Sequence, residues 1–210
     1  MSAAETDLLR RMEALRGCTL GALAQMHGAP ATASKGWTGM LLERALGATA
    51  GSRAIPDFPA LGIELKSVGV DGHARPLEST FVASLNLAEA DHRWETSAVR
   101  KKLARIAWVV VDASMPLLDR RCVRAFLWSP SAAEEATLRG DYEDIIDLLQ
   151  EGFPVRATTG SALQLRPKGR DASHLRRAVN EDGELALAPP RAFYLRRSFV
   201  AGLLDQARRA

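Results

Sequence analysis

Long apolar runs and cysteines are scarce in this chain of 210 residues. Apolar runs such as Ala107–Val111 are far too short to cross a bilayer, and Glu5 and Asp7 stand where a signal peptide would carry basic and then apolar residues. We therefore expect a cytoplasmic protein without a membrane partner. Cys18 and Cys122 lie far apart in sequence and lack metal-ligand spacing, so we interpret them as free, mostly buried thiols.

Two common functional motifs are also absent from the sequence. There is no G-x-x-x-x-G-K-[ST] segment, so we expect the chain to bind no nucleotide itself. The four histidines show no paired metal-ligand spacing, and an exposed or structural role is the default interpretation for each. Any dependence on ATP would have to come from a partner protein.

Charge of one sign is not in large excess, because the formal net charge is only +3, but the charges are segregated along the chain. Acidic residues gather between positions 134 and 151. Such segregation favours a polyanionic partner without naming the chemistry. The basic clusters are Arg100, Lys101, Lys102 and Arg105; Arg166, Lys168 and Arg170; and Arg191, Arg196 and Arg197.

Hydrophobic periodicity predicts helices and strands in mixed order. The predicted helices cover residues 4–15, 20–26, 36–46 (capped by Ser34), 95–105, 131–150, 172–179 and 199–208. The predicted strands cover 61–70, 78–87, 106–112, 123–128 and 162–165, and a turn at Asp71-Gly72 is expected to join the first two as a hairpin. With 47% hydrophobic residues, we expect one α/β (α+β) domain over residues 1–210, a mixed sheet flanked by helices, with two packed lobes.

The segment from Ile55 to Lys66 carries the clearest chemical signal. Residues two apart in a strand share a face, so Glu64 and Lys66 point to one side while Ile63 and Leu65 turn into the core. Asp57 precedes this strand between two prolines, which restrict its backbone. We therefore expect two carboxylates and an ammonium group to converge.

Hydrolysis of a phosphodiester suits this combination, because a hard cation can neutralise the growing charge and activate a water molecule. Asp57 and Glu64 offer the oxygen ligands that Mg²⁺ prefers, and the backbone carbonyl of Leu65 is a further candidate. Lys66 would orient the attacking water and stabilise charge on phosphorus. The D-x6-E-x-K spacing alone is weak, since charged residues on a half-exposed strand are usually its solvated face.

A longer series of segments resembles the MutH family in the same order over nearly the whole chain. The first twenty residues of the chain contribute least to this resemblance. The segments are Lys35-Gly36-Trp37-Thr38-Gly39, Leu41-Leu42-Glu43, Asp57-Phe58, Leu61–Lys66, Pro76-Leu77-Glu78, Thr80-Phe81-Val82, Trp94-Glu95-Thr96-Ser97, Trp128-Ser129-Pro130, Arg166-Pro167-Lys168 and Phe193-Tyr194-Leu195.

This resemblance implies a restriction-endonuclease-like fold with two lobes around a DNA-binding cleft. It also implies a magnesium-dependent DNA endonuclease that nicks the unmethylated strand at hemimethylated GATC sites during mismatch repair, after activation by MutL. Asp57, Glu64 and Lys66 match the family's catalytic residues, and Glu43 matches a further acidic residue at the metal site, where one or two Mg²⁺ ions are expected. Lys35 matches a lysine close to the scissile DNA, where it is expected to contribute to catalysis or to contact with the site.

The resemblance also implies how DNA is read. Arg166 and Lys168 match a loop that meets base edges in the major groove, where Arg and Lys are the usual donors to guanine. Tyr194 matches a residue near the adenine that carries the methyl group, and Phe81 and Lys102 match other DNA-facing positions. Without the resemblance, Phe81 would be a plain core or edge aromatic and Lys102 a solvated helix lysine.

Two other interpretations remain open for the sequence. A GATC-cutting restriction endonuclease would share the same catalytic and recognition segments, although we expect a monomer and such enzymes usually pair two copies. A non-catalytic DNA-binding module would keep the fold and lose turnover. The intact set of Asp57, Glu64 and Lys66 argues against the second interpretation.

Overall fold

The computed structural model describes residues 2–209 except 31, 33, 35, 52, 54, 86–91, 154, 169–175, 180–184 and 189. The chain divides into two compact units, each with its own sheet. Unit 1 comprises Met1–Glu78, Lys102–Ser129 and Ala207–Ala210. Unit 2 comprises Ser79–Lys101 and Pro130–Gln206.

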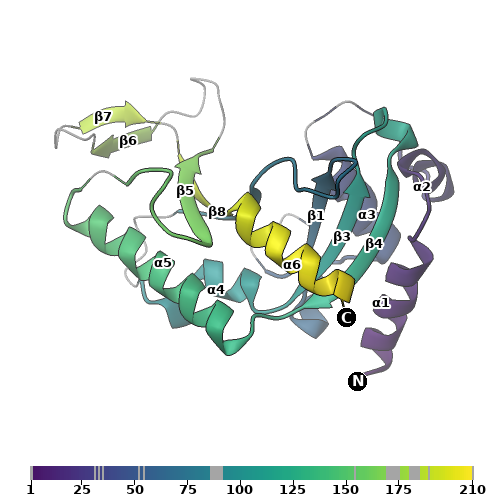
Figure 1. Ribbon diagram of the computed structural model, residues 1–210, viewed down its shortest axis with the longest axis horizontal. Coiled ribbons are helices and arrows are strands. Elements are labelled where there is room, and N and C mark those ends of the chain that lie inside the picture. The colour runs from purple at the N-terminus through teal and green to yellow at the C-terminus, as the bar shows by residue number, and fades with distance from the viewer. Residues whose placement is uncertain are drawn as a thin grey trace. The chain divides into compact units, whose positions relative to one another are not determined.

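The sheet of unit 1 has the order β1-β3-β4 (Figure 1). Its strands are β1 (Glu64–Val70), β3 (Ile106–Asp112) and β4 (Arg121–Trp128). β1 and β3 run parallel and β3 and β4 antiparallel, so the sheet is mixed, as predicted. A parallel pair needs a long crossover, and here the chain passes through unit 2 between β1 and β3.

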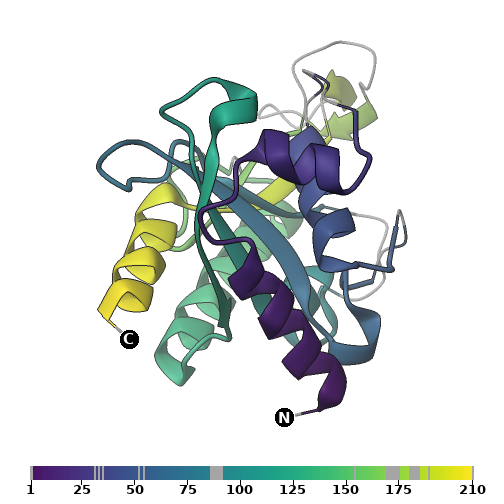
Figure 2. The same ribbon diagram turned by 90° about the vertical axis from the view of Figure 1, so that its right-hand side faces the viewer.

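Helices α1 (Ala3–Ala14), α2 (Leu20–Met26) and α3 (Trp37–Leu46) pack on one face of this sheet (Figure 2). Their apolar side chains form one buried cluster with Ile63, Leu65, Ala107 and Val109. Since neighbouring residues of a strand point to opposite faces, Glu64 and the other even-numbered residues of β1 and β3 lie on the other face. The predicted orientation of this strand is confirmed.

Two local predictions in unit 1 are wrong. Helix α3 is not capped by Ser34, because its N-cap is Gly36 at φ 93°, and no side chain caps it there. The first strand begins at Glu64 rather than Leu61, because Pro59–Leu61 forms a 3-10 turn, η1, and Gly62 follows in the left-handed region at φ 62°.

The predicted hairpin after β1 is also wrong. Asp71 does form a turn, in which its Oδ1 accepts hydrogen bonds from the backbone N–H groups of His73 and Arg75. The returning chain makes only an isolated bridge between Val70 and Pro76. Proline has no N–H to donate to a ladder, and the next strand pairs elsewhere, in unit 2.

The sheet of unit 2 has the order β2-β8-β5 with antiparallel neighbours. Its strands are β2 (Thr80–Ser84), β8 (Arg191–Leu195) and β5 (Leu163–Pro167). A second pair consists of β6 (Arg176–Val179) and β7 (Leu185–Ala188). α5 (Ala132–Gln150) packs beside β5 and begins with a capping box between Ser131 and Glu134.

The remaining elements are short or terminal. They are η2 (Trp94–Thr96), α4 (Ala98–Leu103), η3 (Leu117–Asp119) and α6 (Arg197–Arg209). The predicted helix 95–105 is shortened to α4 because Ser97 is extended, at ψ 147°, and its hydroxyl accepts a hydrogen bond from Arg100 N (3.0 Å). The predicted helix 172–179 is wrong for Arg176–Val179, which is strand β6, and residues 172–175 lie outside the described part of the chain.

The predicted α/β fold, a mixed sheet flanked by helices, is confirmed. Within the described ranges, no helix combines the length and the apolar character that crossing a bilayer requires. Both cysteines are free thiols, as predicted, and Cys122 is fully buried. Burial raises the pKa of the Cys122 thiol to about 12, so this thiol stays protonated at neutral pH.

Candidate functional site

Asp57 is presented by a loop that backbone contacts hold on both sides. The Asp57 carbonyl accepts hydrogen bonds from Thr49 N (3.0 Å) and Ala50 N (3.3 Å). Directly after it, Phe58 and Ile63 pair as a bridge and close the chain around η1. The loop is therefore fixed in unit 1 immediately beside the start of β1.

The Asp57 side chain meets β1 at its open edge. Asp57 Oδ2 accepts a hydrogen bond from Leu65 N (2.8 Å), whereas Glu64 N donates to Arg105 O (3.0 Å) on the β3 side. Successive residues of a strand direct their N–H and C=O groups to opposite edges. The carbonyl of Leu65 therefore faces the edge at which Asp57 lies.

Glu64 is the most deeply buried acidic residue of this site, with 2% of its surface exposed. Its Oε1 accepts hydrogen bonds from Lys66 Nζ (2.7 Å) and Lys102 Nζ (2.8 Å). Its Oε2 is buried and, among the residues that the structure describes, has no hydrogen-bond donor. A buried carboxylate oxygen without a donor is an exception that calls for a ligand or ion.

Electrostatics connect Glu43 of α3 to the same site. Burial, followed by the charges of Asp57 and Glu64, raises the pKa of Glu43. Burial also raises the pKa of Asp57, and the charge of Glu64 adds to this effect, although the hydrogen bond from Leu65 N and the ammonium group of Lys66 oppose it. The three carboxylates are thus close enough for their charges to repel one another.

These side chains are called the carboxylate cluster from here on, and its members are Asp57, Glu64, Glu43, Lys66 and Lys102. Within the described part of the chain, no three His, Cys, Asp or Glu side chains are already gathered in the geometry of a metal site. The chemistry of the cluster nevertheless fits a hard divalent cation, because it offers carboxylate oxygens, mutual repulsion that a cation would relieve, and the buried Oε2 of Glu64.

Lys102 belongs to the carboxylate cluster, and its predicted contact with DNA stays a prediction. It belongs to α4, but its ammonium group lies against the buried Glu64 carboxylate, and 22% of its side chain is exposed. The sequence gives an indirect signal for the contact between Lys102 and Glu64. Lys102 comes shortly before β3, and in a parallel pair the residues before one strand lie near the start of the other, here Glu64 of β1. Lys35 lies outside the described residues.

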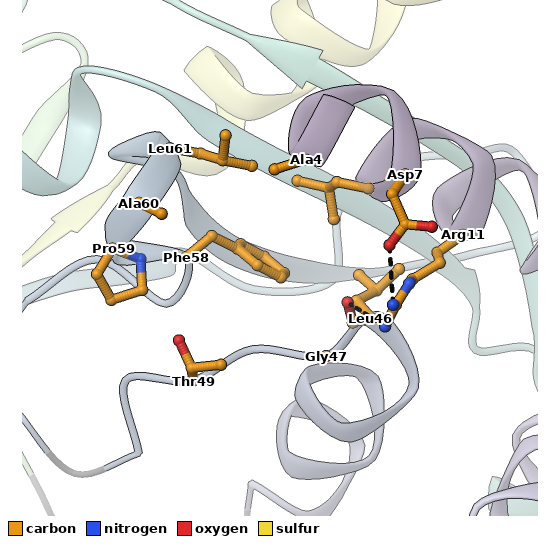
Figure 3. A pocket seen from close by; sticks show the side chains of 11 residues that line it. Ala4, Asp7, Arg11, Leu46, Gly47, Thr49, Phe58, Pro59, Ala60 and Leu61 are labelled. Carbon is orange, nitrogen blue, oxygen red and sulfur yellow. Dashed lines mark hydrogen bonds and ion pairs between the residues drawn. The ribbon is translucent and has the colours of Figure 1, made fainter. Parts of the chain in front are cut away.

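A pocket of about 200 Å³ adjoins the loop that follows Asp57 (Figure 3). Phe58 and Leu61 line it from the loop, and Asp7 and Arg11 line it from α1. Its acidic side chain, Asp7, is paired with Arg11 at 2.8 Å. The described lining residues include no member of the carboxylate cluster, so this pocket is not the candidate reaction site.

Phe81, Tyr194, Arg166 and Lys168 come together on one face of the sheet of unit 2. Phe81 on β2 and Tyr194 on β8 are directly paired, and their rings meet edge to face with centroids 5.6 Å apart. The Arg166 guanidinium carbon lies 5.9 Å from the Tyr194 ring centroid, and Lys168 Nζ lies 5.1 Å from that of Phe81. These distances suit cation–π contacts. This group is called the cation–aromatic face.

Two serines of this face were not anticipated from the sequence. Arg166 Nη1 donates to Ser79 Oγ (2.7 Å), and Lys168 Nζ donates to Ser84 Oγ (2.9 Å). Isolated serines give no sequence signal of their own, and their contacts depend on the pairing of β2 and β5 with β8. Arg170, the third member of the predicted basic cluster here, lies outside the described residues.

Comparisons with known proteins agree on one family. The family model described as "DNA mismatch repair enzyme MutH" matches residues 46–141. The protein named DNA mismatch repair protein MutH from Serratia proteamaculans (strain 568) is 44% identical over 95% of this chain and 92% of its own length. Proteins of the same name from Pasteurella multocida (strain Pm70) and Salmonella paratyphi B (strain ATCC BAA-1250 / SPB7) are 41% and 46% identical over 96% of this chain, and over 95% and 91% of their own lengths.

Proposed function

Because this chain belongs to the MutH family of DNA mismatch repair enzymes, we propose that it is a DNA endonuclease that nicks the unmethylated strand of hemimethylated GATC sites. The observation that carries the proposal is the carboxylate cluster, in which the Asp57 loop, the buried Glu64 and two lysines meet at the start of β1. Such a cluster suits hydrolysis of an anionic phosphodiester.

Asp57, Glu64, Glu43 and the carbonyl of Leu65 would hold one or two Mg²⁺ ions. When bound, Mg²⁺ supplies positive charge at the phosphate and lowers the pKa of a bound water. The chain's own groups do the rest. The Asp57 carboxylate is held by Leu65 N–H, and Lys66 places an ammonium group 2.7 Å from Glu64, where it can orient the attacking water and stabilise charge on phosphorus.

The cation–aromatic face would read the DNA sequence. Arg166 and Lys168 supply the donors that guanine O6 and N7 accept in the major groove. The ring of Tyr194 is half-buried beside them and would be the group that excludes a methylated adenine amino group. Phe81, which meets that ring edge to face, and Lys102 would also contact DNA. Lys35 would act near the scissile bond. The other basic residues would bind phosphates, so affinity should fall steeply with salt.

The proposed setting is the cytoplasm, with double-stranded DNA as substrate and MutL as the activating partner. We propose a monomer over residues 1–210 that is weakly active until MutL and its bound ATP stimulate it. Specificity for the unmethylated strand would then combine base reading with control by the partner.

A nicking assay tests the proposal. The purified protein is incubated with Mg²⁺ and with unmethylated, hemimethylated or fully methylated GATC duplexes, with and without MutL and ATP. We expect nicks in the unmethylated strand only, stimulated by MutL and abolished in an Asp57→Ala control. Strong unaided double-strand cutting would instead indicate a restriction endonuclease, and binding without any cleavage would indicate an inert DNA-binding module.

A further inference from the structure

Two serine hydroxyls hold the cations of the cation–aromatic face in unit 2. Ser79 directly precedes β2 and Ser84 ends it. Arg166 lies on β5 and Lys168 directly follows it, with β8 between β5 and β2. To reach the hydroxyls at 2.7 Å and 2.9 Å, both cationic side chains must cross β8 and lie along the sheet.

Each cation therefore has two points of contact, an aromatic ring and a hydroxyl. The Arg166 guanidinium lies over the Tyr194 ring and donates a hydrogen bond to Ser79. The Lys168 ammonium lies over the Phe81 ring and donates a hydrogen bond to Ser84. Exposed Arg and Lys side chains sample many rotamers in water, and binding DNA has to order them. Side chains that are already held lose less freedom when DNA binds.

The serine contacts leave the cations able to read bases. A guanidinium group has five N–H donors and an ammonium group has three, and each serine bond uses one donor. Bidentate recognition of guanine needs two N–H donors, one for O6 and one for N7. The hydroxyl can thus fix the direction of each cation while the remaining donors meet the base edges.

We propose that Ser79 and Ser84 are positioning residues that orient Arg166 and Lys168 before DNA binds and so determine discrimination between DNA sequences. This inference rests on the proposed function, because it assigns the two cations to base reading. Loss of the two hydroxyls therefore reduces the difference in affinity between the cognate site and other DNA sites. Affinity for phosphates, which depends on charge alone, stays nearly unchanged.

The test measures binding of the full chain to two labelled duplexes by fluorescence anisotropy, with Ca²⁺ in place of Mg²⁺. One duplex contains GATC and the other differs by one base pair within it. The variants are Ser79→Ala, Ser84→Ala, the double variant, and Ser84→Thr, which keeps a hydroxyl. The matched control is Ser198→Ala, an exposed serine of α6. Melting temperatures of all variants report any structural effect.

We expect each alanine variant to lose about fivefold of the ratio between the two affinities, and the double variant about 25-fold, at unchanged melting temperature. Ser84→Thr and the Ser198→Ala control should keep the ratio of the wild type. If the wild type discriminates and the double variant discriminates equally well, the positioning role is wrong while the proposed function stands. If the wild type itself does not distinguish the duplexes, the proposed function and this inference fail together.

Discussion

The two lysines on Glu64 should prove strongly interdependent. Glu64 has 3% of its side chain exposed, and Lys66 and Lys102 contact the same oxygen, Oε1. Replacing either lysine with methionine keeps much of the apolar stem but leaves the buried carboxylate paired with the other lysine. Replacing both leaves a buried charge without its two cations, which is a far larger penalty.

The magnitudes follow from the burial of this group. We expect each single variant to lower the free energy of unfolding by about 1.5 kcal/mol, the value of a hydrogen bond to a charged group. We expect the double variant to lower it by about 4 kcal/mol, as for a buried pair that loses its partner. The double loss thus exceeds the two single losses together by about 1 kcal/mol, which is larger than ordinary deviations from additivity.

Urea unfolding in metal-free buffer measures these values. A fourth variant adds Glu64→Gln to the double lysine variant and should recover most of the loss, because it removes the buried charge itself. Strictly additive losses would contradict the shared role of the lysines. Failure of Glu64→Gln to recover stability would contradict the assignment of the loss to an uncompensated carboxylate.

Three further predictions concern single residues of the two units. Burial and the Glu64 charge raise the pKa of the Asp57 carboxyl above 3.8, so the folded state binds the carboxyl proton more tightly than the unfolded state. Stability therefore falls as pH rises from 3.8 through the raised pKa. Asp57→Asn should raise the melting temperature at pH 7 without metal, while nicking activity falls at least about 100-fold. Asp141→Ala should lower the free energy of unfolding, measured with urea, by about 3 kcal/mol. The buried carboxylate accepts hydrogen bonds from the backbone N–H groups of Ala162 (2.5 Å) and Leu163 (2.8 Å), and the variant leaves both groups without an acceptor. A loss below about 1 kcal/mol would contradict this structural role of Asp141. Gly160→Ala should destabilise the fold by at least about 2 kcal/mol, because Gly160 has a φ of +82° and an added Cβ would lie 2.3 Å from Leu163 O. An unchanged urea midpoint would show that the fold accommodates this Cβ without strain.

Local sequence patterns predicted the elements that carry the carboxylate cluster. Period-two alternation placed Glu64 and Lys66 on the face opposite Ile63 and Leu65, and the structure agrees. The apolar run Ile106–Asp112 predicted β3 to the residue. These predictions succeed because the face that a strand residue occupies depends on its immediate neighbours.

Contacts between distant residues could not be predicted in the same way. Lys102 reaches Glu64 across 38 positions, and only the parallel pairing of β1 with β3 brings them together. β8 was not predicted, since Pro190 gives its first residues the appearance of a loop, yet it is the central strand of its sheet. The same omission hid the partner of β2 and led to the false hairpin after β1.

The proposed nuclease requires that the carboxylate cluster hold a divalent cation. A crystal of the protein with a GATC duplex, grown with Mn²⁺ and measured for anomalous scattering, locates such an ion. We predict a peak within about 2.3 Å of carboxylate oxygens of both Asp57 and Glu64, and beside a DNA phosphate. Mn²⁺ bound elsewhere, or no peak at a concentration that supports nicking, would show that Asp57 and Glu64 do not hold the catalytic ion.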